Sequence, residues 1–420
     1  MKLNKRTNSN LITCTILLLL LVEFFINDIG LPTQLIVLID IVALIMALYL
    51  VVYFKINNFT YLTNLRLVIG VIMIIGLIAL FSFIWNKCSI GFAISWFRLY
   101  IRPFVFFLIT VICLDEKRVY KILNLLNSFV WINVIVCSIQ YFLFNISGDR
   151  CNGLFGTNNT NSWMNVLLCI VFTYNIVLYI NKCTSFKGIV PICIGCIYIS
   201  SLAEIKFFYF EIGIIIILAI MLSKPNRRTI ELGVLGILFL LIASQLIDFI
   251  WGATSSGFFS LEGIQEYLDF NSRGYGYASV GDIGRVGGIV QLNNIFFKNE
   301  INLIGMGPGA CCYGTPFYAL YSNLHYIWFG YTLIYLELGW CGVLAFILFF
   351  VLVVYALFKK QKMEIDMMPR QRSIYFFSII MAILGVILLW YNTTIINYQG
   401  IFLFIAIAFG FVQEKKKMKD

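Results

Sequence analysis

Long apolar runs, separated by short polar segments, recur along most of this chain. Runs of about 18 or more apolar residues are long enough to cross a bilayer as helices. The pattern predicts about twelve spanning segments, at 11–27, 35–54, 67–85, 92–113, 122–144, 163–181, 188–203, 205–222, 229–250, 331–358, 374–392 and 396–412. The region 188–222 is compatible with one segment or two. No run alternates as a membrane barrel strand does, so we predict an all-α membrane protein.

One polar stretch interrupts this pattern and divides the chain into three parts. Between 252 and 330 the apolar runs stop, and a loop of this length is uncommon unless it is functional or disordered. We therefore predict nine spanning helices over 1–251 and one large loop over 252–330. The remaining part, 331–420, is predicted to contain three further spanning helices and a basic tail.

Composition and charge agree with a membrane protein and indicate its orientation. The chain is 61% hydrophobic and only 12% charged. With the N-terminus in the cytoplasm, most of the 30 Lys and Arg residues fall in cytoplasmic segments, as the positive-inside rule requires. Both termini are then cytoplasmic and the large loop is extracytoplasmic. The net charge of +10 follows from this topology, so no nucleic acid partner is expected, while the basic tail suits anionic membrane lipids.

A minority of the basic residues lies outside the cytoplasmic segments, against this bias. They are Lys87, Arg98, Arg102, Arg150, Lys206, Arg273, Arg285 and Lys298. Ionisable residues within spanning segments are costly, and they indicate a functional site by default. Arg98 and Arg102 are four residues apart in an apolar run and therefore share a helix face. They either snorkel or pair with carboxylates, or they bind a pyrophosphate, which arginine contacts in bidentate fashion.

Three polar segments are predicted on the outer side of the membrane. The segment 147–161 contains Arg150 and is rich in Gly and Asn, which suits plain turns or hydrogen bonds to sugar hydroxyls. Glu204 and Lys206 lie in a tight turn between two spans, where they either pair or contact a ligand. The third segment is the large loop. It contains three carboxylates, Glu262, Glu266 and Asp269, whose spacing predicts one face of an amphipathic surface helix.

Motifs for metals and nucleotides are missing from the sequence. The twelve cysteines are scattered, mostly within apolar runs, where they pack as small hydrophobic side chains. The single histidine, His325, cannot build a zinc site. The glycine run at 305–309 lacks the Lys-Ser/Thr pair that follows a phosphate-binding loop. We therefore expect no metal and no other cofactor.

Short motifs in the outer segments carry a family resemblance. Asn323-Leu324-His325 is followed by Leu336-Glu337-Leu338-Gly339. Upstream, Arg285-Val286-Gly287-Gly288 precedes the turn Gly305-Met306-Gly307-Pro308-Gly309, and Arg150-Cys151-Asn152-Gly153-Leu154-Phe155 lies in an earlier loop. Together with the large outer loop before the last spans, these motifs resemble the O-antigen polymerase and O-antigen ligase superfamily.

The resemblance implies a metal-independent glycosyltransferase of GT-C-like architecture in the bacterial inner membrane. Its substrate would be an oligosaccharide on undecaprenyl pyrophosphate at the outer face of that membrane. We expect it to polymerise repeat units into a surface polysaccharide, either O-antigen, capsule or exopolysaccharide, with a chain-length regulator protein as a partner. A ligase that transfers finished glycan to a lipid or protein acceptor is an alternative. A lipid-linked oligosaccharide flippase or other transporter, and a membrane assembly protein without chemistry, are further alternatives.

The resemblance also implies roles for individual residues. His325 is the expected general base, since histidine commonly moves protons at neutral pH. The expected catalytic set is His325, Arg285 and Glu204. The residues expected to hold the pyrophosphate and offset the charge on the leaving group are Arg98, Arg102, Arg150, Lys206 and Arg273. Glu262 and Asp282 are weaker candidates for the base.

Overall fold

The computed structural model describes residues 5–56, 65–157, 161–251, 265, 283–363 and 367–412. All regular elements among these residues are helices. The helices before the large loop are α1 (Lys5–Asn27), α2 (Val37–Ile56), α3 (Arg66–Trp85), α4 (Ile90–Cys113), α5 (Glu116–Phe142), α6 (Asn161–Ile180), α7 (Phe186–Leu202), α8 (Lys206–Leu222) and α9 (Arg227–Trp251). Those from the loop onward are α11 (Gly288–Phe296), α12 (Pro316–Tyr321), α13 (Gly330–Met363), α14 (Pro369–Tyr391) and α15 (Gln399–Ala408).

Eight of the described helices are long and apolar enough to cross a membrane. They lie at Ser9–Asn27, Thr33–Tyr53, Arg66–Trp85, Ile90–Cys113, Glu116–Phe142, Asn161–Ile180, Gly330–Gln361 and Pro369–Tyr391. The prediction of an all-helical, multi-pass membrane protein is therefore confirmed in this coarse form. A helix also covers each remaining predicted segment, and 188–222 forms two helices, α7 and α8. The count of about twelve spans stays a prediction.

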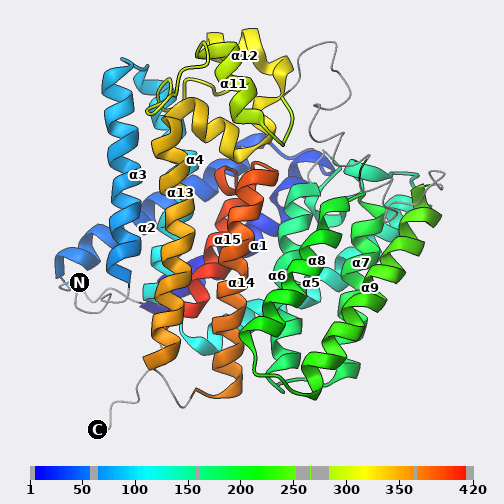
Figure 1. The fold of residues 1–420 in the computed structure, drawn as a ribbon. Helices are drawn as coiled ribbons and strands as arrows, with labels where there is room; N and C mark the ends of the chain where they lie inside the picture. Colours follow the sequence, from blue (N-terminus) through cyan, green and yellow to red (C-terminus); the bar gives the residue numbers. More distant parts are fainter. Residues whose placement is uncertain are drawn as a thin grey trace.

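The helices form a bundle that is covered at one end by the described part of the large loop (Figure 1). The short helices α11 and α12 lie at this end, above α13. Local signals start α12: the Thr315 side chain accepts a hydrogen bond from the Tyr318 N–H, and Pro316 occupies the first turn. The described part of the loop is thus folded onto the bundle.

An aromatic core fixes α4 against the C-terminal helices. The Phe104 ring centroid lies 5.0 Å from those of Phe349 in α13 and Phe404 in α15, and both pairs are edge-to-face. Phe107 makes a similar contact with Phe349, at 5.6 Å. Interlocked rings of this kind add specific geometry to the burial of apolar area. They hold the segment of α4 that carries Arg102.

Helix α13 is interrupted near the end of the bundle where α11 and α12 lie, which we call the outer end, and residues of the large loop fill the break (Figure 1). Gly339 has φ 65° and ψ −164°, which no helix permits. The N–H of Met306 donates to the Leu336 carbonyl at 2.7 Å, and the N–H of Cys341 donates to the Leu303 carbonyl at 3.1 Å. Irregular backbone at membrane depth is tolerated where protein satisfies its polar groups, as these bonds do. Loop residues 302–307 therefore contact the bundle at the broken helix.

Candidate functional site

The first part of the site is a cluster within the helices. Arg102 Nη1 donates to Asp40 Oδ1 at 2.5 Å, and Arg98 Nε lies 3.6 Å from Asp40 Oδ2. The Arg102 guanidinium also stacks over the ring of Tyr398, 4.1 Å from its centroid. We call Asp40, Arg98, Arg102 and Tyr398 the buried arginine cluster. Two guanidinium groups in it share one carboxylate, so one positive charge has no counter-charge within the cluster.

Burial makes this excess charge costly. The Arg102 side chain is only 2% exposed, whereas that of Arg98 is 48% exposed. Two nitrogens of Arg102, Nε and Nη2, are buried and meet no acceptor with hydrogen-bond geometry within the described part of the chain, although the guanidinium also lies close to the Tyr398 hydroxyl. Leaving a buried charged donor without a hydrogen-bond acceptor costs more free energy than leaving a neutral donor without one. An anionic ligand would supply the missing acceptor and the missing negative charge. At 1.5 Å per residue, Arg102 lies roughly 18 Å along α4 from its first residue.

The sequence left two interpretations of Arg98 and Arg102 open. Pairing with a carboxylate is confirmed, and the carboxylate is Asp40 of α2. The pairing uses only part of the hydrogen-bonding capacity of Arg102, so it does not exclude a ligand. Asp40 was missed by the sequence analysis. Its signal was a lone carboxylate inside the apolar run 35–54.

The second part of the site brings together three outer segments. The carboxylate of Asp149, in the turn η3 (Gly148–Arg150), interacts electrostatically with the positive charges of Lys206 and Arg285. A Cβ atom added to Gly148 would lie 3.3 Å from the Glu204 carboxyl group, so the turn at Glu204 faces η3. We call Asp149, Glu204, Lys206 and Arg285 the outer polar cluster. Three of its members were predicted site residues, whereas Asp149 was missed.

Opposing effects act on the Asp149 carboxyl group. Partial desolvation by its neighbours raises the pKa of Asp149, and this is the largest effect. The charges of Lys206 and Arg285, and a hydrogen bond from Asn161 Nδ2, lower the pKa and offset part of the rise. More than a third of the Asp149 surface is exposed, so solvent screens each of these effects. Arg150 is the exposed neighbour of Asp149 at the end of η3.

Arg285 is held between aromatic rings at the end of α14. Its Nε donates to the Tyr391 carbonyl at 3.2 Å, and its guanidinium lies 4.2 Å from the centroid of the Tyr391 ring. Tyr391 is stacked in turn on Phe207 of α8, with centroids 3.6 Å apart. The hydroxyl of Tyr331 donates to the Arg285 carbonyl. These contacts fix both the backbone and the side chain of the predicted loop arginine.

His325 lies beside the Arg285 segment. The N–H of Ile283 donates to the Leu324 carbonyl at 3.2 Å, so the two stretches run next to each other. His325 has φ 56° and ψ 19°, a left-handed conformation that histidine tolerates better than most residues. Its ring is partly buried and stacks on Trp328, with centroids 3.9 Å apart. The left-handed backbone and the Trp328 ring together therefore set the direction of the imidazole.

Helix α6 connects the two clusters. Its first residue, Asn161, donates to Asp149 of the outer polar cluster. Two residues later, Trp163 stacks on Tyr398, the ring that covers Arg102. The buried arginine cluster therefore lies just below the outer polar cluster, within about one turn of α6.

Glu337 anchors the loop to the bundle. The side chain is fully buried, and its Oε2 accepts a hydrogen bond from the Tyr100 hydroxyl at 2.9 Å. Its Oε1 accepts from the Cys312 thiol at 3.6 Å, and backbone N–H groups of Cys311 and Gly309 also bond to the carboxyl group. A Cβ atom on Gly305 would lie 2.2 Å from the Glu337 carbonyl carbon. The glutamate and the glycines of the motif therefore position the loop.

Several predicted residues lie outside the described part of the chain. They are Glu262, Glu266, Asp269, Arg273 and Asp282. Within the described ranges, no group of three or more His, Cys, Asp or Glu side chains is arranged to hold a metal ion.

Comparisons with known proteins add no relative to this description. Neither a family model nor a curated protein matches the chain. The resemblance to the O-antigen polymerases and ligases therefore stays a prediction, and function must be inferred from the chemistry of the two clusters.

Proposed function

We propose that this protein is a membrane glycosyltransferase that polymerises repeat units carried on undecaprenyl pyrophosphate into a surface polysaccharide. The observation that carries the proposal is Arg102, with two buried guanidinium nitrogens unbonded within the described residues and with Arg98 sharing its only carboxylate. A pyrophosphate supplies both the negative charge and the acceptor oxygens that such an arrangement lacks. Binding it there would also stabilise the charge that develops as the pyrophosphate leaves.

The position of the clusters supports the same chemistry. The lipid tail keeps the pyrophosphate close to the bilayer, so the sugars extend outward from the buried arginine cluster toward the outer polar cluster. An acceptor hydroxyl oxygen attacks the anomeric carbon of the donor, and the bond from that carbon to the pyrophosphate oxygen breaks. His325 accepts the hydroxyl proton, and Arg285, Lys206 and Glu204 orient the sugars. No cofactor or metal is part of this proposal.

This mechanism requires the clusters to face outward. We infer that the protein lies in the bacterial inner membrane with both termini in the cytoplasm, on the basis of its basic-residue pattern. A reporter that is active only outside the cytoplasm, inserted after Asn299, is expected to be active, and one fused after Asp420 inactive. The reverse result would exclude an extracytoplasmic reaction at this site.

The structure of the surface glycan tests the activity. Cells that lack the protein are expected to carry glycan of a single repeat unit, and cells that regain it are expected to carry long chains. A ligase would instead leave long chains that are not attached to their acceptor. A transporter would leave the lipid-linked unit on the cytoplasmic side. Cells with unchanged chain length would contradict the proposal.

A further inference from the structure

Two buried cysteines meet beneath the outer polar cluster. Cys137 lies near the outer end of α5, and Cys151 follows η3; both are free thiols with no exposed surface. Cys137 Sγ lies 3.9 Å from the Cys151 carbonyl oxygen, and Cys151 Sγ lies 3.6 Å from the Cys137 carbonyl oxygen. The two thiols are also within hydrogen-bond contact of each other. This reciprocal packing places the sulfur atoms side by side.

The backbone around this pair is fixed by polar side chains of the same α5 face. Gln140 Oε1 accepts from the Gly153 N–H at 2.7 Å, and Gln140 Nε2 donates to the Gly153 carbonyl at 3.1 Å. Asn133 Oδ1 accepts from the Leu154 N–H at 2.8 Å. Asn133, Cys137 and Gln140 follow the spacing of one helix face. These bonds hold the loop that carries Cys151 against the α5 face that carries Cys137.

We propose that Cys137 and Cys151 form a disulfide as the loop closes onto α5 during folding. An external disulfide of the class R–S–S–R accepts the two electrons and two protons that the thiols release, and it leaves as two R–SH molecules. Compartments outside the cytoplasm supply such oxidants. The bond requires the outward orientation proposed above, but it is independent of glycosyl transfer.

The bond would secure the segment that carries Asp149 and Arg150. The two cysteines are separated by 14 residues, and closing a loop of this kind restricts the unfolded chain. In the folded protein it would join α5 covalently to the turn that faces Lys206 and Arg285. The outer polar cluster would then be stabilised from below.

Counting alkylated cysteines tests the bond. The full-length protein is purified from cells quenched in acid, denatured, and alkylated with and without prior reduction; its mass then gives the number of labels. The wild-type protein is expected to take up two fewer labels without reduction than after it. Without reduction, Cys137→Ser and Cys151→Ser are each expected to take up one more label than the wild type, because the former partner becomes free. The control Cys14→Ser, an exposed position, is expected to take up one fewer.

The opposite sign of these changes separates the proposal from its alternatives. Labelling of all twelve cysteines without reduction would overturn it. It would also be overturned if Cys137→Ser lowered the label count by one, as the control does, since any bond would then involve other cysteines. The count is made on denatured protein, so it stands even where a variant folds poorly, and glycan synthesis does not affect it.

Discussion

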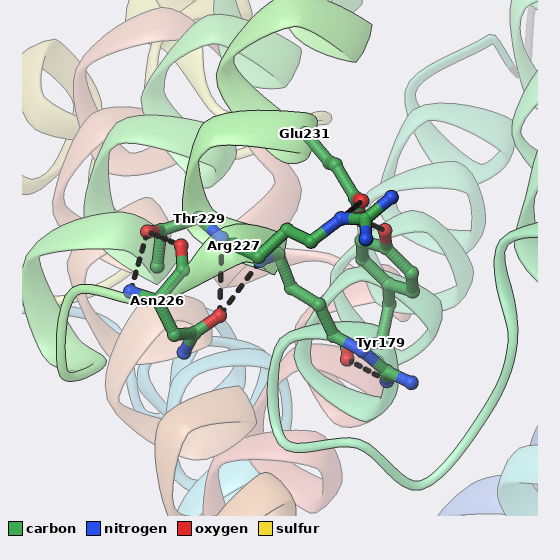
Figure 2. A network of polar contacts seen from close by, with 6 residues as sticks. Tyr179, Asn226, Arg227, Thr229 and Glu231 are labelled. Atoms are coloured by element: carbon green, nitrogen blue, oxygen red, sulfur yellow. Dashed lines mark hydrogen bonds and ion pairs between the residues drawn. The ribbon is translucent and has the colours of Figure 1, made fainter.

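A polar cluster containing arginine, tyrosine and a carboxylate lies at each end of α6, and the two clusters differ in how their polar groups are bonded. At the outer end of this helix lies the buried arginine cluster, covered by Tyr398, on which Trp163 stacks. At the other end, Tyr179 belongs to a polar network with Asn226, Arg227, Arg228 and Glu231, which we call the α9 network (Figure 2). The two ends are about 27 Å apart along the helix.

The α9 network satisfies its own hydrogen-bonding groups. Arg227, 91% exposed, pairs with Glu231 at 2.7 Å, and the Tyr179 hydroxyl donates to the same carboxylate. Arg228 Nη1 donates to the carbonyls of Tyr179 and Thr184, at 2.7 and 2.9 Å. The Asn226 side chain accepts from backbone N–H groups at the start of α9. No buried side-chain atom of this network lacks a partner within the described residues.

The buried arginine cluster has the same charge ratio, two guanidinium groups to one carboxylate, but it differs in hydrogen bonding. Arg102 retains unbonded donors although its side chain is almost fully buried. The comparison teaches that arginine content does not identify a site. What distinguishes the two regions is unmet hydrogen-bonding capacity combined with exclusion of water, and that combination is what an anionic ligand relieves. The following predictions test this distinction.

Loss of the general base is expected to have the largest effect. His325→Asn keeps a residue that accepts the left-handed backbone but removes the imidazole. Because a positioned base contributes about 100- to 10,000-fold, we expect chain elongation to slow by that factor while protein amount and donor binding are retained. Elongation is measured as glycan chain length over time. Wild-type elongation in this variant would remove His325 from the mechanism.

Loss of Arg102 is expected to have the next largest effect. Each hydrogen bond to a charged group contributes about 1.5–3 kcal/mol, so Arg102→Ala is expected to reduce elongation at least about 100-fold. Arg102→Lys should recover it only in part, since lysine cannot make the bidentate contact. Arg227→Ala in the α9 network is the matched control and should elongate normally, because exposed ion pairs contribute little. Equal effects of the Arg102 and Arg227 substitutions on elongation would show that unmet hydrogen-bonding capacity does not mark the functional arginine.

Neutralising the whole ion pair separates folding from function. Arg102→Met alone leaves Asp40 with only Arg98 as a partner, and we expect a lower amount of folded protein. Adding Asp40→Asn should restore the amount, because a buried pair can be replaced by neutral groups at little cost. Elongation should stay low in the double variant. If elongation also returned, the pair would be purely structural.

The sequence predicted the helices of the fold better than it predicted the arrangement of the site. Apolar runs predicted the helices, because backbone groups in hydrocarbon must bond within their own segment. The break at Gly339 was not predictable, since the residues bonded to each other there, at 302–307 and 336–341, are 30 or more positions apart along the chain. The four-residue spacing of Arg98 and Arg102 indicated a shared face. It gave no sign that only Arg102 would be enclosed, because its enclosure involves Asp40 of α2 and Tyr398, which directly precedes α15.

A smaller effect is expected in the outer polar cluster. Since desolvation raises the pKa of Asp149, its charged form is disfavoured in the folded state. The wild type should therefore be slightly less heat-stable than Asp149→Asn above the folded pKa, and the difference should vanish as the pH falls and the carboxyl is protonated. Melting temperatures measured between about pH 4 and pH 8 check this. A wild type that is more stable at neutral pH would show that Lys206 and Arg285 outweigh desolvation.

Binding of a polyprenyl pyrophosphate to purified protein tests the central claim most directly. The wild type, Arg102→Ala and Arg227→Ala are compared in lipid nanodiscs, with the corresponding polyprenol as the uncharged reference ligand. We predict that the wild type and Arg227→Ala bind the pyrophosphate with equal affinity and that Arg102→Ala binds it at least about 100-fold more weakly. Equal binding by all three proteins, or no preference for the pyrophosphate over the polyprenol, would contradict the assignment of the buried arginine cluster as its site.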